Sequence, residues 1–209
     1  MIRVAREGWP FIIGAVAIAL VLWLMGWWFL LVPWIAVTLW VVAFFRNPER
    51  PGPRGEELII APADGLVVSV ISMDEPSFIG GSATRVSIFM NVFDVHVNRY
   101  PASGTVAWRE YQPGRFLNAA TEKASRENEQ SSVGLETIRG KLLVRQIAGL
   151  VARRIITDHA EGTLVTQGDR MGLIRFGSRV DVFLPPGAEP RVREGERTRA
   201  GQTVIAAWT

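Results

Sequence analysis

Two histidines, His96 and His159, are the side chains of this sequence that can change charge near neutral pH, because the chain has no cysteine. His96 lies in the segment FDVHVNRYP. If this segment is a strand, Asp94, His96 and Asn98 share one face and the opposite face is apolar. Simple alternation with the polar face in water is one interpretation, and a general base or acid at His96 is the other. His159 lies among turn-forming residues in TDHAEGT, which indicates a surface position.

Two further short patterns could carry chemistry. Asp64 lies in PADGL, where Asp-Gly is first of all a turn signal. Gly177 and Ser178 interrupt LIRFGSRVDVFLP, a run otherwise rich in strand-forming residues. A glycine inside a strand pattern usually marks a β-bulge or a tight turn. Taken alone, neither pattern distinguishes a structural role from a catalytic one.

The composition removes several classes of function. Zinc needs at least three protein ligands, and neither an HxH nor an HExxH pattern supplies them, so we expect no metal. The lack of cysteine also removes disulfides and thiolate nucleophiles from this chain. The net charge is +3, and no arginine-rich run or interleaved basic and aromatic patch predicts a nucleic-acid partner.

The chain begins with a long apolar stretch. Residues 11–45 carry no charge, and a helix that crosses the hydrocarbon core needs about 20 apolar residues. Gly26 and Pro33 near its middle predict a hairpin of two helices that spans the membrane or dips into one leaflet. A cleaved signal peptide would have a much shorter apolar region. Basic residues flank both ends of the apolar stretch: Arg3, Arg6, Arg46, Arg50 and Arg54. This distribution favours a location of both ends at the cytoplasmic face of the cell membrane.

The remainder of the chain must position the candidate residues. After a linker at residues 46–57, rich in Pro, Gly and charge, short β-type runs alternate with turn residues, which indicates a sandwich or barrel. The segments APADGLVVSV and VREGERTRAGQTVIA resemble the barrel-sandwich hammerheads of biotinyl and lipoyl carrier domains, although neither Lys123 nor Lys141 lies in their modified turn. We therefore predict membrane-associating helices in residues 1–45 and a mainly β, hammerhead-like domain in residues 58–209. Residues 116–132 are polar without a period of two, which predicts a loop or a short helix.

Four motifs follow one another in the β part: APADG, FDVHVNRYP, FLNA with KASRENE, and RFGSRVDVFLP. Together they resemble phosphatidylserine decarboxylase in its short bacterial and archaeal form, over residues 58–208. The resemblance implies that the chain cuts itself between Gly177 and Ser178 and converts Ser178 into a pyruvoyl group, a covalent cofactor used instead of pyridoxal phosphate. A larger chain of residues 1–177 and a smaller chain of residues 178–209 would stay associated, with any higher oligomer left open.

The resemblance also implies a role for each site residue. The Ser178 hydroxyl would attack the Gly177 carbonyl with His96 as its base, and Asp64 would orient or charge-balance the histidine. The pyruvoyl ketone would form a Schiff base with the amine of phosphatidylserine, accept electrons as carbon dioxide leaves, and release phosphatidylethanolamine. On this interpretation, the Gly-Ser break is the precursor of the cofactor.

The sequence departs from the longer bacterial members of that family at two places. Arg99 stands where they have a second histidine, so the role of that histidine does not transfer, and a contact of Arg99 with the lipid phosphate is an alternative. At the implied cut site, those members commonly have Leu-Gly-Ser-Thr, whereas this chain has Phe176-Gly177-Ser178-Arg179.

Two other functions stay open from the sequence. One is a membrane-anchored hammerhead adaptor without activity, which would remain a single chain of 23.2 kDa. The other is decarboxylation of an archaeal ether lipid that presents the same headgroup.

Overall fold

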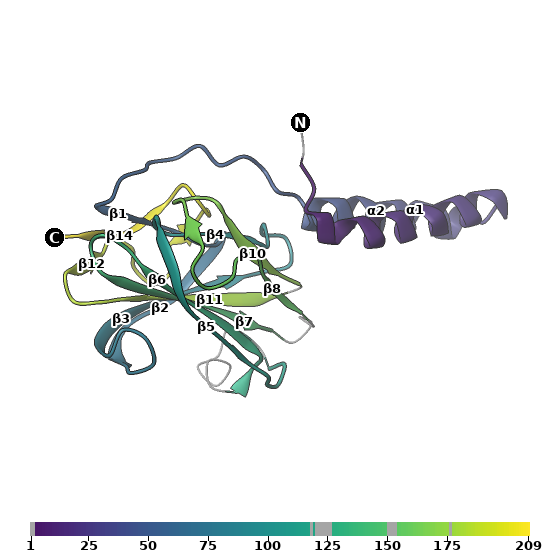
Figure 1. The fold of residues 1–209 in the computed structure, drawn as a ribbon. Helices are drawn as coiled ribbons and strands as arrows, with labels where there is room; N and C mark the ends of the chain where they lie inside the picture. The colour runs from purple at the N-terminus through teal and green to yellow at the C-terminus, as the bar shows by residue number, and fades with distance from the viewer. Residues whose placement is uncertain (1–2, 118, 120–126, 150–153, 176) are drawn as a thin grey trace. The chain divides into compact units, whose positions relative to one another are not determined.

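The computed structural model describes residues 3–117, 119, 127–149, 154–175 and 177–209. The chain forms two compact units, residues 1–49 and residues 50–209 (Figure 1). The division falls inside the stretch whose composition predicts a linker. The first unit is helical, and the second is built of strands.

The first unit is a helical hairpin. A 3-10 turn at Arg6–Gly8 precedes α1 (Trp9–Leu24) and α2 (Trp28–Phe44). The turn between the two helices contains Gly26 with φ +69°, a left-handed conformation that glycine adopts without a Cβ clash. The Trp34 indole donates a hydrogen bond to the Ala15 carbonyl at 2.8 Å and so links the helices.

Most side chains on the outside of this hairpin are apolar and exposed, Phe29 for example to 75%. A helix that is apolar on every face is typical of a membrane segment or of a deeply buried core. Among the described residues one helix, Arg6–Leu24, is long and apolar enough to cross a membrane, and the other apolar helix is shorter. The predicted hairpin is confirmed, and its apolar surface supports membrane association.

The second unit is a β structure of three sheets, so the predicted mainly β class is confirmed. Its strands are β1 (Leu58–Ile60), β2 (Gly65–Glu75), β3 (Gly81–Met90), β4 (Val97–Arg99), β5 (Gly104–Gln112), β6 (Gln130–Glu136), β7 (Lys141–Ala148), β8 (Ile155–Thr157), β9 (Leu164–Val165), β10 (Arg170–Ile174), β11 (Ser178–Leu184), β12 (Ala188–Pro190), β13 (Arg197–Thr198) and β14 (Val204–Trp208). Two small sheets, β1-β14-β12 and β4-β10-β8, accompany one eight-stranded sheet, β13-β2-β3-β11-β7-β6-β5-β9.

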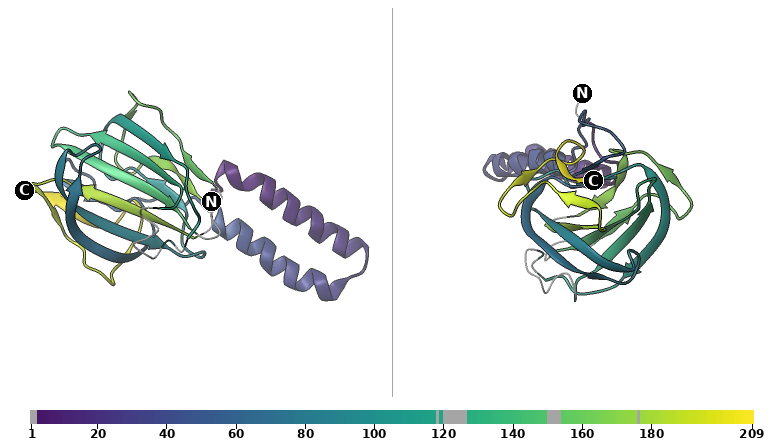
Figure 2. Two further views of the ribbon diagram at one scale, coloured as in Figure 1. Left: turned by 90° about the horizontal axis from the view of Figure 1, so that it is seen from below. Right: turned by 90° about the vertical axis from the view of Figure 1, so that its left-hand side faces the viewer.

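The eight-stranded sheet curls around the main apolar core (Figure 2). β11 lies between β3 and β7, antiparallel to both, and all seven of its residues are buried. On one face of β11, Val180 and Val182 join the main core. On the other face, Phe183 packs in a second apolar cluster, and Arg179 forms an ion pair with Asp181 at 2.6 Å. Both faces of this strand are therefore closed to solvent.

The two segments that resemble carrier hammerheads pair with each other. β13 runs antiparallel to the start of β2, with Thr198 opposite Gly65. The Thr198 hydroxyl donates to the Ala63 carbonyl at 2.9 Å. This contact brings the PADG turn, which contains Asp64, against the C-terminal segment of the chain.

The run LIRFGSRVDVFLP is not one strand. Its first part is the end of β10, which pairs with β4 and β8, and its second part is β11 of the curled sheet. Gly177 lies at the junction with φ +62°. The break at Gly177-Ser178 is therefore a passage from one sheet to another.

The prediction of a loop or short helix for residues 116–132 is wrong at its C-terminal end, where β6 begins at Gln130. Residues 118 and 120–126 of that segment lie outside the described residues. Ser131 and Ser132 are polar but buried, because the Ser131 hydroxyl bonds that of Thr157 at 2.8 Å and Arg145 donates to the Ser132 hydroxyl at 3.0 Å. Polar partners hold this strand, so an apolar pattern does not reveal it.

The turn between β2 and β3 is organised by one carboxylate. Glu75 is 3% exposed and accepts hydrogen bonds from the backbone N–H groups of Ser77, Phe78 and Ile79 at 3.1, 3.0 and 2.8 Å. Burial by itself would raise the pKa of the Glu75 carboxyl, but these hydrogen bonds outweigh it, and the pKa is lowered. Glu75 therefore contributes stability above its ordinary pKa, and this contribution is lost as the pH falls through the lowered value.

Glu75→Gln should reduce the free energy of unfolding by about 1–2 kcal/mol at pH 7, because a neutral amide accepts these bonds less strongly than a carboxylate. The difference from wild type should shrink at an acidic pH below the lowered pKa of Glu75, where the wild-type carboxyl is also neutral. Urea titrations of the detergent-solubilised protein at both pH values measure it. Glu189→Gln, at an exposed strand position, is the control and should change stability by less than about 0.5 kcal/mol. An equal loss at both pH values would contradict the prediction.

Candidate active site

Ser178 is the first residue of β11 and is fully buried. It lies opposite Met90 of β3 on one side and Ala148 of β7 on the other. The Ser178 hydroxyl points to the Met90 sulfur at 3.4 Å. The Gly177–Ser178 peptide is therefore fixed at its C-terminal end by two neighbouring strands and kinked at its N-terminal end by the left-handed glycine.

Gly149, directly after β7, makes room for the Gly177 carbonyl. A Cβ on Gly149 would overlap the carbonyl oxygen of Gly177. A glycine is thus required at position 149 by close backbone approach. Sequence reasoning missed this residue, because nothing in the local pattern around Gly149 indicates what its backbone contacts.

His96 lies directly before β4 and is fully buried beside the Gly-Ser peptide. Its Nδ1 is 3.1 Å from the Asp94 carbonyl oxygen, and its Nε2 is 3.3 Å from the Gly177 backbone nitrogen. A carbonyl oxygen accepts and a backbone N–H donates, so this geometry assigns the proton of the neutral ring to Nδ1 and the lone pair to Nε2. The structure brings His96 and the predicted cut site together.

The expected alternation around His96 is only partly correct. His96 and Asn98 are both fully buried, so the predicted polar face is not in water. Phe93, expected on the apolar face, is 71% exposed, because residues 91–94 form a turn in which Asp94 accepts the Asn91 backbone N–H at 2.9 Å. Alternation fails here because the strand begins only at Val97.

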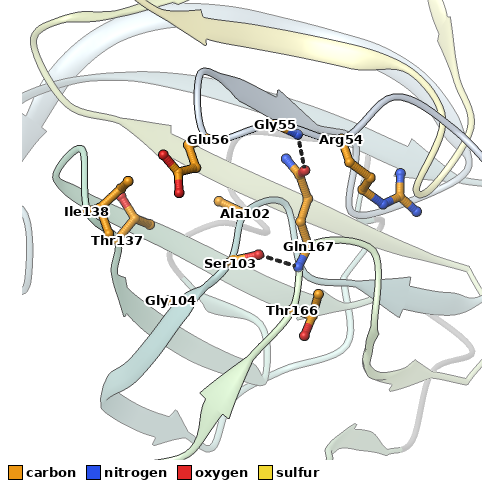
Figure 3. Close-up of a pocket in the computed structure, with 10 residues that line it drawn as sticks. All are labelled: Arg54, Gly55, Glu56, Ala102, Ser103, Gly104, Thr137, Ile138, Thr166 and Gln167. Atoms are coloured by element: carbon orange, nitrogen blue, oxygen red, sulfur yellow. Dashed lines mark hydrogen bonds between the residues drawn. The ribbon is translucent and has the colours of Figure 1, made fainter.

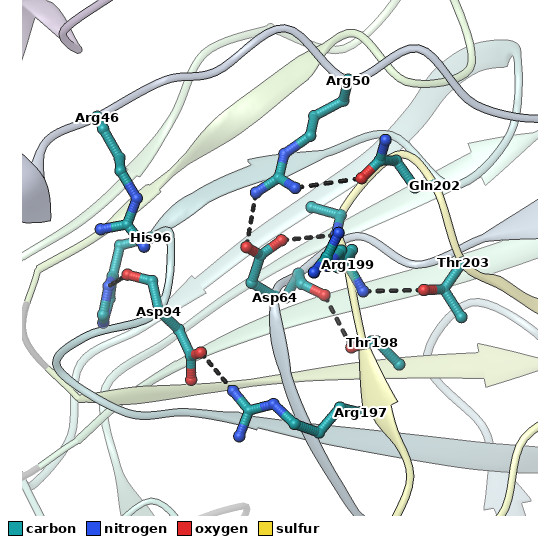
Figure 4. A network of polar contacts seen from close by, with 12 residues as sticks. Arg46, Arg50, Asp64, Asp94, His96, Arg197, Thr198, Arg199, Gln202 and Thr203 are labelled. Carbon is teal, nitrogen blue, oxygen red and sulfur yellow. Dashed lines mark hydrogen bonds and ion pairs between the residues drawn. The ribbon is translucent and has the colours of Figure 1, made fainter. Parts of the chain in front are cut away.

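Asp64 lies in the turn before β2 and is 9% exposed. Its carboxylate accepts the Ala200 backbone N–H at 2.7 Å and pairs with Arg50 at 2.6 Å (Figure 4). Asp64 and Asp94 line one cavity of about 430 Å³, together with Arg197, Thr198, Arg199 and Thr203. The two carboxylates thus reach the same space, and the role of Asp64 toward His96 stays a prediction.

Three arginines lie near Asp64 or near one another: Arg50 and Arg54 of the linker, and Arg99 of β4. Arg99 donates to the Gly168 carbonyl at 2.8 Å, and Arg54 donates to the Gly201 carbonyl at 2.8 Å. Burial, followed by the positive charges of Arg50 and Arg54, lowers the pKa of Arg99. Such a concentration of positive charge suits an anion, and a contact of Arg99 with a lipid phosphate remains a prediction.

His159 is partly buried rather than on the surface. Its Nδ1 is 3.1 Å from the Tyr100 hydroxyl, and the two rings are 5.5 Å apart. Burial and the nearby Asp158 and Asp169 raise the pKa of Tyr100 to about 12, although the charge of Arg109 opposes them. The Tyr100 hydroxyl therefore stays neutral at pH 7.

A second cavity, of about 320 Å³, has mainly apolar walls (Figure 3). Gln167 accepts the Gly55 N–H at 3.0 Å there, and its own N–H donates to the Ser103 hydroxyl at 2.9 Å. None of the site residues named above lines it except Arg54; its other residues include Gly104, Thr137 and Ile138. Within the described part of the chain, no group of three or more His, Cys, Asp or Glu could hold a metal.

Comparison with known proteins assigns the chain to an enzyme class, the carboxy-lyases, rather than to adaptor proteins. The family model described as phosphatidylserine decarboxylase matches residues 37–206, a range that contains Asp64, His96, Gly177 and Ser178. The chain belongs to the phosphatidylserine decarboxylase family.

Relatives named phosphatidylserine decarboxylase proenzyme match nearly the whole chain. One from Symbiobacterium thermophilum is 51% identical over 97% of this chain and 94% of its own length. One from Geobacter metallireducens is 48% identical over 97% of this chain and 95% of its own length. One from Rhodospirillum rubrum is 48% identical over 96% of this chain and 86% of its own length. The resemblance carried by the four motifs is confirmed.

Gly149→Ala should slow the predicted cut between Gly177 and Ser178 about tenfold or more, because the added methyl group would displace the carbonyl that Ser178 is expected to attack. Denaturing gels taken over a time course of maturation measure the uncut fraction. Gly81→Ala is the control, since a Cβ there meets no atom within 4 Å. Equal cutting rates in the two variants would contradict the prediction.

Proposed function

We propose that this chain decarboxylates phosphatidylserine to phosphatidylethanolamine with a pyruvoyl group that it makes from Ser178. The observation that carries the proposal is the left-handed Gly177 next to a buried serine, with His96 Nε2 at 3.3 Å from the Gly177 nitrogen. Family membership supports the reaction and the substrate. The word proenzyme in the names of the relatives supports maturation by cutting.

The proposed cut uses only groups of the chain and water. The Ser178 oxygen attacks the Gly177 carbonyl carbon, the amide bond breaks, and the Ser178 nitrogen takes up a proton, which leaves an ester and a free amine. The Cα proton of residue 178 is then removed, the Cβ–O bond breaks, and Gly177 departs as a carboxylate with the serine oxygen. Water adds to the remaining unsaturated residue and releases ammonia, so that a ketone stands at the former Cα.

The residues at the junction fit the precursor of such a group. Gly177 exposes its carbonyl through a conformation that a side chain would disfavour, and Gly149 leaves space for that carbonyl. Once formed, a pyruvoyl group supplies a ketone that condenses with the lipid amine and accepts electrons as carbon dioxide leaves. His96 is the candidate base, because its Nε2 lone pair faces the junction and can hold or return a proton there.

The two chains produced by the cut would remain associated without a covalent link. The smaller chain would begin with β11, which is hydrogen-bonded on both sides to strands of the larger one. β14 pairs with β1 and β13 pairs with β2, which adds two further contacts between the chains. A heterodimer of residues 1–177 and 178–209 is therefore the expected mature form.

The apolar helical hairpin supports the proposal of a membrane lipid as the substrate. Exposed apolar side chains cover α1 and α2, and Arg6–Leu24 is long enough to cross a membrane. The basic residues at both ends of the apolar stretch favour the cytoplasmic face of the cell membrane. An enzyme held in this way would meet its substrate at the surface of the bilayer.

Ser178→Ala should remain one chain of 23.2 kDa, whereas the wild type should yield two, because alanine lacks the attacking oxygen. Intact-mass spectrometry distinguishes them and also reads the pyruvoyl cap on the smaller chain. Ser69→Ala, in β2, is the control and should mature as the wild type does. Two fragments from Ser178→Ala, or an uncut wild type with an ordinary serine, would reject the proposal.

His96→Ala should slow decarboxylation by about 10²- to 10⁴-fold, the usual contribution of a positioned acid or base, and should impair cutting as well. Asp64→Asn should mature slowly if the carboxylate supports the histidine. Rates of product formation and of cutting measure the two effects. The control is His159→Ala, which removes the other histidine and should keep both rates near those of the wild type. Wild-type rates in His96→Ala would exclude His96 from the mechanism.

A further inference from the structure

A buried amide lies next to Ser178 and has no part in the chemistry described so far. Asn98 of β4 is fully buried, and its Nδ2 points to the Met90 sulfur at 3.6 Å. The same sulfur receives the Ser178 hydroxyl at 3.4 Å. The Asn98 amide and the Ser178 hydroxyl thus meet at one atom.

The orientation of this amide is fixed by a chain of polar side chains. Gln146 of β7, also fully buried, donates to the Asn98 Oδ1 at 2.7 Å. The Thr157 hydroxyl donates to the Gln146 Oε1 at 2.9 Å and is 2.8 Å from the Ser131 hydroxyl. Because a thioether has no proton to donate, the amide nitrogen rather than the oxygen must face Met90. Three uncharged side chains on three strands, Gln146, Thr157 and Ser131, therefore direct the N–H groups of Asn98 toward the cut site.

The amide donors meet a poor partner in the uncut chain. A thioether sulfur is a weak acceptor, and a buried amide without a good partner destabilises a fold by about 1–3 kcal/mol. Asn128 is equally buried nearby, yet its amide is fully used: its Nδ2 donates to the carbonyls of Leu117 and Ala148 at 2.8 and 2.7 Å, and its Oδ1 accepts the Leu117 N–H at 2.9 Å. Hydrogen bonds within the fold account for the burial of Asn128. Asn98, in contrast, could exchange its weak sulfur acceptor for an oxygen of a bound substrate.

We propose that the Asn98 amide binds the carboxylate of the serine headgroup in the mature enzyme, an inference that rests on the proposed function. When the chain cuts, the Ser178 oxygen leaves with Gly177 and vacates its position against the Met90 sulfur. The substrate then brings an anionic oxygen pair to residue 178. Asn98 is a buried side chain whose amide N–H groups, held in the uncut chain by a weak sulfur acceptor, face that position.

A neutral donor suits a carboxylate that must lose its charge. A buried arginine would form charge-assisted bonds to the carboxylate and stabilise the ground state more than the transition state, in which the negative charge moves away. An amide orients the carboxylate with a weaker bond. Asn98, Gln146, Thr157 and Ser131 are all uncharged, as this requirement demands.

The test compares two lipids that share an amine and differ in the carboxylate. Purified, mature full-length enzyme is mixed with phosphatidylserine or with phosphatidylethanolamine and treated with borohydride, and the mass of the smaller chain reports covalent capture. Asn98→Leu removes the donors. Asn98→Asp also removes them but keeps an acceptor for Gln146, and so preserves the fold if leucine does not.

Both variants should lower the capture of phosphatidylserine relative to phosphatidylethanolamine by about tenfold or more, the effect of one hydrogen bond to a charged group. Asn128→Leu is the matched control, and any damage it causes should reduce capture of both lipids alike. An unchanged ratio in the Asn98 variants, or an equal loss for both lipids, would overturn the inference while leaving the proposed function intact. Failure of the wild type to capture either lipid would instead overturn the proposed function, and this inference with it.

Discussion

The antiparallel pairing of β11 with β3 and β7 is the constraint on which the rest of the site depends. It fixes Ser178 opposite Met90 and Ala148, so the first peptide of β11 has almost no freedom to move. Gly177, with φ +62°, lies directly before this strand, where the chain passes from the sheet of β10 into the sheet of β11. A peptide bond that is rigid on one side and kinked on the other keeps its carbonyl in one position, and intramolecular attack benefits most from such positioning.

The two faces of β11 indicate how the proposed cut could leave the fold unchanged. One face is part of the main apolar core, and the other carries the Arg179–Asp181 ion pair, with Arg179 also donating to the Ser87 hydroxyl at 2.7 Å. A buried ion pair contributes little net stability, but removal of one partner leaves an uncompensated charge. The ion pair lies within β11, and the Arg179–Ser87 hydrogen bond joins it to β3, so these contacts would remain if the covalent link at the start of β11 were cut as proposed.

The sequence predicted the parts of this structure that depend on local pattern. The helical hairpin, the break at Gly177 and the mainly β class follow from hydrophobic runs, glycine positions and alternating strand and turn residues. The close approach of Gly149 to Gly177, and the contact of Asn98 with Gln146, join residues far apart in the chain. No period or propensity of a single segment encodes such contacts. The buried serines of β6 were missed for the same reason, since their partners lie on β7 and β8.

Because Ser178–Thr209 supplies a central strand of the curled sheet, topology would set the order of folding and the proposed cut. In the proposed maturation, the sheet would assemble while the polypeptide is still continuous, when closing the loop to β11 is a unimolecular event. After the cut, an opened molecule would have to find its lost fragment by diffusion, at a rate that depends on concentration. The mature protein would thus be kinetically stable: each copy would fold once, and its lifetime would depend on a slow rate of unfolding rather than on refolding.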